Sequence, residues 1–409
     1  MTTREAVALA LFAGGTAWNF GNAGPIVTPI SEEFSASLGV VGLISGAALY
    51  GALLLATATS PTLTKRAGAA NSARAACALG GLGNIIFALA PTLGVALGGR
   101  VIAGYGVGIT VVVGPAIARA MGGVRGVGIF GAAIMIGIAL ALGIGGLLEN
   151  AGADWRISVL LAAAISVLAL PFLPRHVDVA RPGPREPGIA RQLLRSTRLW
   201  RLSAVFLGTL GISVTVGAWL VYYLSVEGDE STAVAGLLSF LIFGVAAVMR
   251  IVGGRLDHRG VPKSVLIGLT PMIAAAGIAA LAIEPTIEIA IPAAVMIGTG
   301  LALPYAAMFD EAQRLFPKRP VSAIAFVSVG ANGSPALLIP LVGILFAAGR
   351  LEFAWLMLAA IVAAGGLANL RSGSATRPRS SEPRNPAETV TAAETVTSGD
   401  RAPPDSRAP

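Results

Sequence analysis

Twelve long apolar runs occupy most of this 409-residue chain, and a polar segment rich in Arg and Pro, residues 174–201, divides them into two sets of six. A helix needs roughly 20 mostly apolar residues to cross the hydrocarbon core of a bilayer. Hydrophobic residues make up 55% of the sequence and charged residues only 12%, too few to cover the surface of soluble domains. We therefore predict an all-α membrane protein with twelve transmembrane helices in two six-helix halves.

Six spans are expected on each side of the polar segment. In the first half they cover residues 6–30, 38–59, 75–90, 93–117, 127–148 and 157–173. In the second half they cover residues 202–224, 233–252, 265–283, 289–309, 321–348 and 353–370. Residues 371–409 are polar with almost no large apolar side chains, which predicts a disordered tail. The predicted domains are an N-terminal bundle (1–173), a central loop (174–201), a C-terminal bundle (202–370) and this tail.

Positive charge alternates between successive connections. Of the 29 Lys and Arg residues, only Arg156 and Arg350 fall in the connections on one side, which carry acidic residues such as Glu33 and Glu227 instead. By the positive-inside rule the basic connections are cytoplasmic, as are both termini, the central loop and the tail. The net charge of +8 therefore reflects membrane topology and needs no nucleic-acid partner. We expect a monomeric, multi-pass protein of the cell membrane.

The residues that catalysis would need are missing from the sequence. The two histidines, His176 and His258, lie in predicted cytoplasmic loops, and Cys77 is the single cysteine. No cluster of His, Cys and carboxylates has the spacing of a metal site or a catalytic triad, and there is no Walker-type phosphate loop. We expect no enzyme activity, no metal and no cofactor.

Charged residues inside the predicted spans are few. Only Arg100 and Arg250 lie there, and no Asp or Glu does; Asp310 and Glu311 follow the end of the tenth span. A charge at the centre of a membrane helix costs about 2.5–3.5 kcal/mol on insertion scales and is usually functional. Arg100 lies roughly 11 Å into its span, near the midplane. Two roles are open for it: binding a substrate, or a structural role in bonds to backbone carbonyls.

Other polar and aromatic residues in the spans are candidates for a central cavity. Asn19 and Asn22 share one helix face, and Asn332 and Tyr222 lie in later spans. Interhelical hydrogen bonding is an equal alternative for the asparagines, and the aromatic belt is an alternative for Tyr222. Near the cytoplasmic end of its span, Arg250 either lines the cavity or pairs with Asp257 or lipid headgroups. The candidate substrate site is thus Arg100, Asn19, Asn22, Asn332, Tyr222 and Arg250.

Glycine and proline recur inside the spans. Some glycines are spaced four residues apart, which lets helix backbones approach closely. These pairs are Gly42 and Gly46, Gly94 and Gly98, and Gly104 and Gly108. Prolines within the spans predict kinks, of the kind that transporters place near their cavity. They include Pro25, Pro115, Pro271, Pro304, Pro335 and Pro340.

The connection between the eighth and ninth spans carries a recognisable motif. Gly253, Asp257, His258 and Gly260 resemble the cytoplasmic loop signature of the major facilitator superfamily, with His258 where Arg is usual. The first-half counterpart has Lys65 where the family has Asp. The resemblance implies that Gly253, Asp257, His258 and Gly260 form a conformational gating loop.

Two further motifs support this resemblance. The segment from Arg100 to Gly106 is similar to the fourth-helix motif of the family. Arg250 with the following glycines, and the segment around Asn332, resemble the nitrate/nitrite and cyanate permease branches. The resemblance implies the major facilitator fold, with a substrate site between the two halves.

Three functions are compatible with these features. The leading hypothesis is a secondary transporter that moves a small inorganic or organic anion by alternating access, because both charges inside the spans are cationic. The second is an exporter of an uncharged or lipophilic compound, in which Arg100 is structural. The third is a membrane receptor or scaffold that transports nothing. The expected partners are a small-molecule, anionic substrate and the lipid bilayer.

Overall fold

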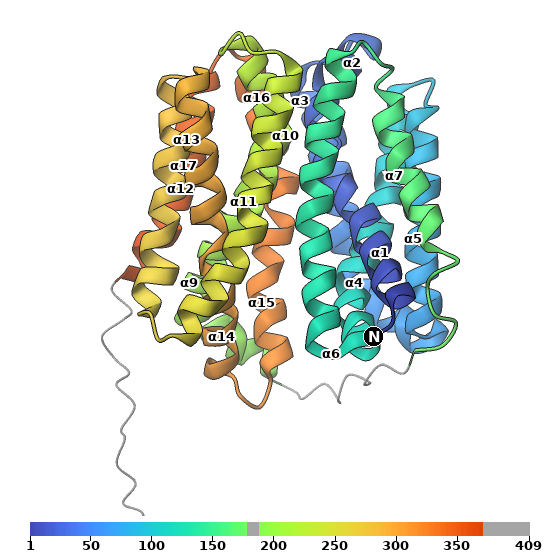
Figure 1. Cartoon of the computed structure of the whole chain (residues 1–409), viewed down its shortest axis with the longest axis vertical. Helices are drawn as coiled ribbons and strands as arrows, with labels where there is room; N and C mark the ends of the chain where they lie inside the picture. The colour runs from blue at the N-terminus through green and yellow to red at the C-terminus, as the bar shows by residue number, and fades with distance from the viewer. Residues whose placement is uncertain (178–187, 371–409) are drawn as a thin grey trace, which may run out of the picture. The chain divides into compact units, whose positions relative to one another are not determined.

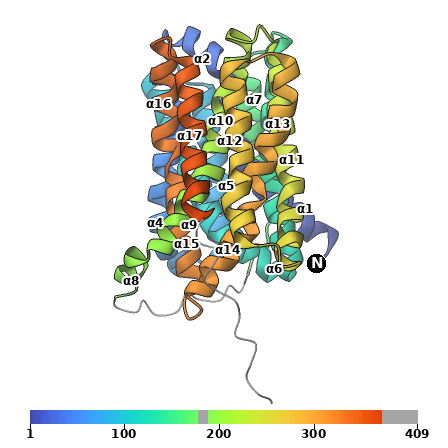
Figure 2. The same ribbon diagram turned by 90° about the vertical axis from the view of Figure 1, so that its left-hand side faces the viewer.

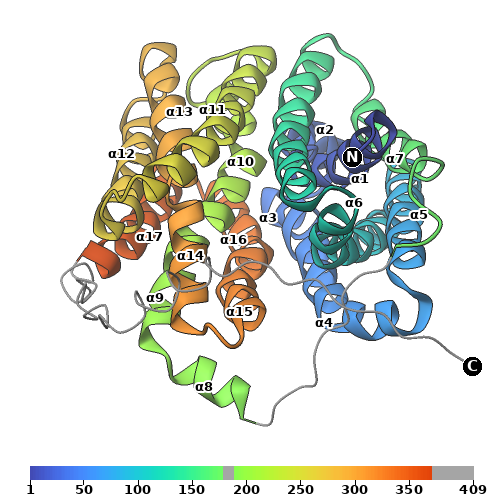
Figure 3. The same ribbon diagram turned by 60° about the horizontal axis from the view of Figure 1, so that its bottom comes forward.

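The computed structural model describes residues 1–177 and 188–370, and this part of the chain contains helices and no strand. The helices form two bundles, the first coloured blue to green and the second yellow to red (Figures 1 and 3). The N-terminus and α14 lie at one end of the bundles and α2 at the opposite end (Figure 1). The predicted all-α fold in two six-helix halves is confirmed.

The first bundle follows the predicted order of spans. Its elements are α1 (Thr3–Gly21), η1 (Gly24–Ile26), α2 (Val27–Glu33), α3 (Leu38–Gly42), η2 (Leu43–Ala48), α4 (Leu49–Ala67), α5 (Ala69–Ala88), α6 (Leu93–Asn150) and α7 (Arg156–Ala169). The first span is α1 continued through η1 and α2, and the second is α3 continued through η2 and α4.

The second bundle repeats this organisation. Its elements are α9 (Thr197–Phe206), η3 (Leu207–Gly211), α10 (Ile212–Val226), α11 (Thr232–His258), η4 (Ser264–Leu269), α12 (Thr270–Ile283), α13 (Ile287–Ala302), α14 (Pro304–Leu315), α15 (Pro320–Gly333), α16 (Pro335–Ala347) and α17 (Leu351–Leu370). A short helix, α8 (Ile189–Arg195), precedes the bundle. The seventh span begins with α9 at Thr197, five residues before the predicted start at Leu202.

The fourth and fifth spans meet at a glycine turn within α6. Gly122 and Gly123 have non-helical backbone angles, and Gly123 has a φ of +57°, which disfavours residues with a Cβ. The turn separates two helices long and apolar enough to cross a membrane, Leu93–Gly123 and Arg125–Asn150. A pair of glycines in the sequence therefore takes the place of a longer loop.

Nine helices of the described part are long and apolar enough to span a bilayer on their own. The other three spans are α1, α5 and α7. In the first span the α-helix stops at Gly21 and the chain continues through η1. α5 carries Arg74 and Asn84, which lower its hydropathy, and α7 has only 14 residues.

Several predicted proline kinks are observed as helix breaks. Pro25 lies in the 3-10 turn η1, Pro304 begins α14 and Pro335 begins α16. Proline suits the first turn of a helix, where its missing N–H would have no partner. Pro115 and Pro340 instead lie inside α6 and α16, which continue past them.

Glycine pairs bring helices together at two of the three predicted places. A Cβ on Gly42 would lie 2.7 Å from the Cα of Pro340 in α16, and one on Gly108 would lie 2.5 Å from the carbonyl oxygen of Leu53 in α4. The prediction is wrong for Gly94 and Gly98, which have no such neighbour within 4 Å. Spacing alone does not say which face of a helix meets a partner.

The two bundles also meet through glycine. In the fifth span, Gly146 packs against Gly236 of α11, where a Cβ on Gly236 would lie 2.9 Å from the Cα of Gly146. A Cβ on Gly46 of η2 would lie 2.8 Å from side-chain atoms of Ile339 and Pro340 in α16 and 2.9 Å from the carbonyl oxygen of Pro335. Glycines of one bundle therefore pack closely against the other bundle at this interface.

A cluster of charges joins the connections at the α2 end of the first bundle. Arg156 pairs with Glu33 and with Asp154, and its Nε donates a hydrogen bond to the carbonyl oxygen of Ala88. The indole N–H of Trp155 donates to Glu33 at 2.7 Å. The backbone N–H of Arg156 donates to the Asp154 carboxylate and lowers its pKa. These bonds tie together the ends of α2, α5 and α7.

The glycine contacts predict a difference between two positions in the fourth span. Gly104→Ala should lower the free energy of unfolding by about 1–3 kcal/mol, because its Cβ would collide with the backbone of Leu49 in α4. Gly98→Ala is the matched control, since its Cβ would meet nothing within 4 Å. Thermal unfolding of the purified proteins in detergent would measure both. Equal melting temperatures for the two variants would contradict this packing.

Candidate functional site

Arg100 lies in the interior of the first bundle. It is 1% exposed, and it is the eighth residue of the fourth span, which α6 begins at Leu93. One terminal nitrogen donates to Asn22 Oδ1 at 3.3 Å and the other to the backbone carbonyl of Asn19 at 3.5 Å. The guanidinium carbon lies 5.1 Å from the centroid of the Phe87 ring. Three of the six predicted substrate-site residues, Arg100, Asn19 and Asn22, are thus brought together.

Asn22 lies where the first span breaks. It is the C-cap of α1, just before the turn that contains Pro25, so its side chain is placed by the end of the helix. Its Oδ1 accepts the bond from Arg100, whereas its Nδ2 is buried without a hydrogen-bond partner. An unused amide donor therefore lies beside the guanidinium.

Asn19 is held by a residue that the sequence analysis did not single out. Asn84 of α5 donates to Asn19 Oδ1 at 2.9 Å and to the carbonyl oxygen of Gly80 at 2.8 Å. The Asn19 amide in turn donates to the carbonyl oxygen of Gly15. Both asparagines are buried, so this bond joins α1 to α5 inside the membrane. The only signal in the sequence was a lone amide in an otherwise apolar span.

Tyr50 is a second addition to the site. Its hydroxyl is buried without a hydrogen-bond partner and lies within electrostatic range of Arg100. Its ring stacks on Phe20 with centroids 5.6 Å apart. The second span thus contributes to the surroundings of Arg100, along with α1, α5 and α6.

The hydrogen-bonding groups around Arg100 are mostly donors. Arg100 Nε, Asn22 Nδ2 and the Tyr50 hydroxyl are all buried without a partner, and so is the acceptor Asn84 Oδ1. The guanidinium donates to a neutral amide and to a neutral carbonyl. Buried polar groups are normally paired. A site with spare donors and a positive charge is chemically suited to an anion.

Arg250 occupies a separate site in the second bundle. Its guanidinium lies over the Tyr305 ring at 4.1 Å, and its Nε is buried without a partner. It lines a cavity of about 10 Å³, room for about one water molecule. Thr209 and Ser213 of the seventh span and Met135 of the first bundle line the same cavity. The cavity therefore lies where the two bundles meet.

The alternative pairing of Arg250 with Asp257 is wrong. Asp257 instead forms an ion pair with Lys263 at 2.7 Å. Lys263 lies just before η4 and can reach both α11 and α14, whereas the Arg250 side chain packs on Tyr305.

Tyr222 and Asn332 are placed apart from Arg100. Tyr222 is partly buried and packs against Trp219 and Phe346, with ring centroids 6.1 and 5.9 Å away. Asn332 is partly buried near the end of α15, before the break at Pro335. Within the described residues, no hydrogen bond or ring contact joins either of them to Arg100. Their role in substrate binding stays a prediction.

The predicted gating loop forms the end of α11. Gly253 packs closely on the backbone of Leu303, and His258 is the last, exposed residue of the helix. Gly260 has a φ of +81° and closes the helix end with a bond from its N–H to the Asp257 carbonyl. Gly253 thus allows close packing and Gly260 allows the turn of the backbone, and Asp257 provides the charge.

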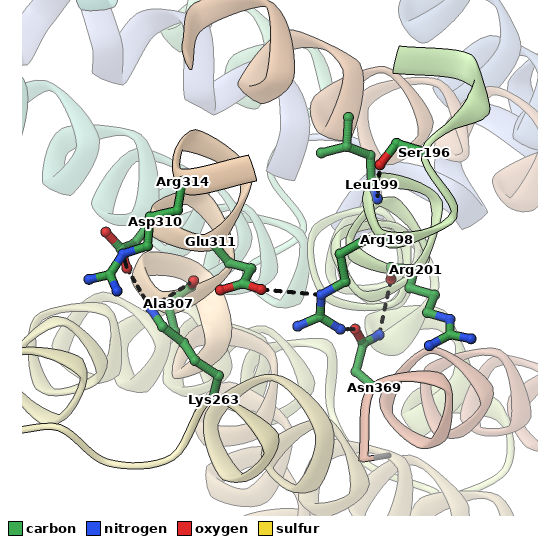
Figure 4. Close-up of polar contacts among 10 residues, drawn as sticks. All are labelled: Ser196, Arg198, Leu199, Arg201, Lys263, Ala307, Asp310, Glu311, Arg314 and Asn369. Atoms are coloured by element: carbon green, nitrogen blue, oxygen red, sulfur yellow. Dashed lines mark hydrogen bonds and ion pairs between the residues drawn. The ribbon is translucent and has the colours of Figure 1, made fainter. Parts of the chain in front are cut away.

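Asp257 belongs to an ionic network within the second bundle through its ion pair with Lys263. Figure 4 shows Lys263 with other members of the network, among them Asp310 and Arg314. Lys263 contacts Asp310 at 2.6 Å as well as Asp257, and Arg314 contacts Asp310 at 2.9 Å. Next to them, Arg198 pairs with Glu311 and donates to Asn369. The network joins α9, α11, α14 and α17 at one end of the bundle.

The first bundle has no such network at the matching position. In the described part of the chain, Lys65 is exposed and forms no hydrogen bond or ion pair, and the following turn ends at Gly68 with a φ of +83°. The turn geometry of the motif is therefore repeated, but its charged contact is not. The described residues also contain no group of three or more His, Cys, Asp or Glu able to hold a metal ion.

Solved structures with the same arrangement of helices are transporters. A bacterial homologue of the human lysosomal transporter Spinster, inward-facing and unoccupied, has a TM-score of 0.71 and 16% identity over 91% of this chain and 98% of its own. A D-xylose–proton symporter has a TM-score of 0.70 and 15% identity over 88% and 96%. The xylose transporter XylE from E. coli, inward open and partially occluded, has a TM-score of 0.66 and 15% identity over 90% and 98%. At these identities the likeness shows the fold alone.

Sequence comparison supplies the family. Comparison with curated proteins returns no match. The profile described as Major Facilitator Superfamily matches residues 7–322, well over half of the chain. The resemblance seen in the loop and fourth-helix motifs is confirmed, and this protein belongs to the Major Facilitator Superfamily.

Proposed function

We propose that this protein is a secondary transporter that moves a small inorganic or organic anion across the membrane by alternating access of its two bundles. The observation that carries the proposal is Arg100, a buried cation with spare donors around it and no carboxylate in its span or any other predicted span. The likeness to nitrate/nitrite and cyanate permeases is a weaker support, from motifs in the sequence.

The charge of Arg100 explains why an anion is the favoured ligand. Moving an isolated charge out of water is costly, and it is usually offset by a paired charge. Asn22 Oδ1 and the Asn19 carbonyl, at 3.3 and 3.5 Å, carry no net charge and make long bonds. An anion that entered the site would supply the missing charge and occupy the unused donors.

The donors also limit the kind of anion. The guanidinium is a planar fork that can hold a carboxylate or another oxyanion through two parallel bonds. Asn22 Nδ2 and the Tyr50 hydroxyl, both without a partner, would add single bonds. Such a site suits a small oxyanion with two or three oxygens. Arg250, beside the cavity between the bundles, provides a second positive charge in the other half.

The sequence constrains how transport is coupled to an ion gradient. The predicted spans contain no Asp or Glu, so no carboxylate inside them can carry a proton. A proton moved with the substrate would have to travel on the substrate itself or on groups in the loops.

An exporter of an uncharged or lipophilic compound is the second candidate. It is favoured by one observation, the two protein acceptors that Arg100 already has. In that case Arg100 only joins α6 to α1. A receptor or scaffold without transport is a third, weaker candidate. Transport measurements separate all three.

The orientation and organisation of the chain are part of the proposal. The alternation of basic and acidic connections supports a cell-membrane protein with both termini in the cytoplasm. We also propose that it works as a monomer. We propose four domains, at residues 1–173, 174–201, 202–370 and 371–409. The last of these lies outside the described residues, and the central loop is described only in part.

Transport by Arg100 variants tests the proposed function. Purified protein in liposomes is offered radiolabelled nitrite, cyanate, acetate and lactate, with neutral D-xylose for comparison. We expect uptake of an anion. The apparent affinity should be about tenfold weaker or worse in Arg100→Lys and Arg100→Gln, because a charge-assisted bidentate hydrogen bond is lost. Arg119→Gln, an exposed arginine of the same helix, is the matched control and should keep wild-type affinity. A neutral or cationic substrate, or wild-type affinity in Arg100→Gln, would refute the anion site.

The gating loop gives a separate prediction. We propose that Asp257, held by Lys263, stabilises one conformation of the second bundle. Asp257→Asn should therefore lower the maximal transport rate several-fold and leave the KM unchanged. Lys65→Ala changes the matching position of the first bundle, where no charged contact exists, and should have little effect. The division of roles between the bundles fails if the two variants lose rate equally or if Asp257→Asn changes KM instead.

A further inference from the structure

The chain enters the second bundle through a basic elbow, which we define as residues 188–201. It comprises α8 and the first turn of α9, and it contains four arginines and no Asp or Glu, namely Arg191, Arg195, Arg198 and Arg201. In both views α8 lies outside the bundles, at the same end as α14 (Figures 2 and 3). The elbow is thus a lateral attachment at the point where the seventh span begins.

Contacts on its inner side fix the elbow to the bundle. Leu193 and Leu199 are 7% and 0% exposed and belong to the hydrophobic core near α14 and α15. The Ser196 hydroxyl accepts a hydrogen bond from the Leu199 N–H and caps the start of α9. Arg198 points inward to Glu311 and Asn369 (Figure 4). The orientation of the outer side is therefore determined by the fold.

Two large apolar side chains cover the outer side. Leu194 is 57% exposed and Trp200 is 52% exposed. The indole N–H of Trp200 donates to the carbonyl oxygen of Leu194 at 2.9 Å, so the two residues lie together. The Trp200 ring contacts Phe326 edge-on at 5.0 Å, and the rest of the ring is uncovered. These contacts fix the Trp200 ring beside Leu194.

Positive charge lies beside this apolar pair. Arg191 and Arg195 are both exposed and are four residues apart in α8, so they share one face of the helix. In the described part of the chain neither forms a hydrogen bond or an ion pair. Leu193 faces the protein, Leu194 is exposed to one side, and the two arginines lie farther round the helix. This pattern is that of a helix lying in a membrane interface.

We propose that the elbow binds anionic phospholipid headgroups of the cytoplasmic leaflet. Arg191 and Arg195 pair with the headgroup phosphates, and Leu194 and Trp200 enter the boundary between headgroups and acyl chains. Trp is favoured at this depth because its ring is amphipathic, and basic residues next to a span are attracted to acidic lipids. The position supports a lipid over a soluble partner, because Trp200 lies three residues after the start of the span Thr197–Val226. The binding is independent of the transported substrate.

The amount of lipid that stays bound during purification tests the role of Arg191 and Arg195 in the elbow. Full-length protein is purified in mixed micelles with equal amounts of phosphatidylglycerol and phosphatidylcholine, and bound lipid is counted by native mass spectrometry. We expect the wild type to retain phosphatidylglycerol preferentially and the Arg191→Gln/Arg195→Gln variant to lose at least half of it. Arg119→Gln/Arg125→Gln removes two exposed arginines from the first bundle and should lose none. Equal retention in the wild type and the elbow variant, or an equal loss in the control, would overturn the proposal.

Fluorescence quenching tests the apolar part of the same surface. The emission of Trp200 is obtained as the difference between the wild type and Trp200→Phe. In liposomes of phosphatidylglycerol brominated near the headgroup, this emission should fall by more than half. The remaining four tryptophans give the reference emission. An unquenched difference would mean that Trp200 faces water, which contradicts membrane insertion of the elbow.

Discussion

A bilayer interior offers no partner for a backbone hydrogen bond, and this constraint shapes the whole structure. Every backbone group within the hydrocarbon must be paired inside the protein, so the spans are helices. Lipid also removes the hydrophobic drive that would press helices together, so close packing must hold them. Gly42 against Pro340 and Gly146 against Gly236 are contacts of this kind, and they join the two bundles.

The same constraint makes a buried charge informative. In the second bundle the acidic residues Asp257, Asp310 and Glu311 are at the end of the helices, each with a basic partner. Arg100 has no such partner and lies deep in the first bundle. The charges of this network are thus paired, whereas Arg100, like Arg250, has no carboxylate partner within the described residues, and Arg100 has spare donors around it. A ligand is the simplest explanation for keeping that arrangement.

Much of the fold could be predicted from the sequence, because hydropathy and the placement of Lys and Arg act over whole spans. Arg100, Asn19 and Asn22 could also be singled out, because they are polar residues in apolar spans, but Tyr222 and Asn332, singled out with them, make no contact with Arg100 in the described residues. The bond between Asn84 and Asn19 could not be predicted, because it depends on how α5 is rotated against α1. The prediction of close packing at Gly94 and Gly98 was wrong for the same reason. Their spacing matched a packing motif, but their face of α6 meets no helix. Lys263 was missed as the partner of Asp257 because an ion pair depends on where a loop side chain reaches.

The central claim is that Arg100 is kept for a ligand and contributes little to folding, and thermal unfolding tests it most directly. Replacing a buried, poorly paired charge by an apolar side chain of similar size is often neutral or stabilising. Purified Arg100→Met should therefore unfold at or above the wild-type temperature without ligand. The anion transported by the wild type should raise the wild-type melting temperature and leave that of the variant unchanged. A variant that melts several degrees below the wild type in the absence of ligand would show that Arg100 is structural and would contradict the account.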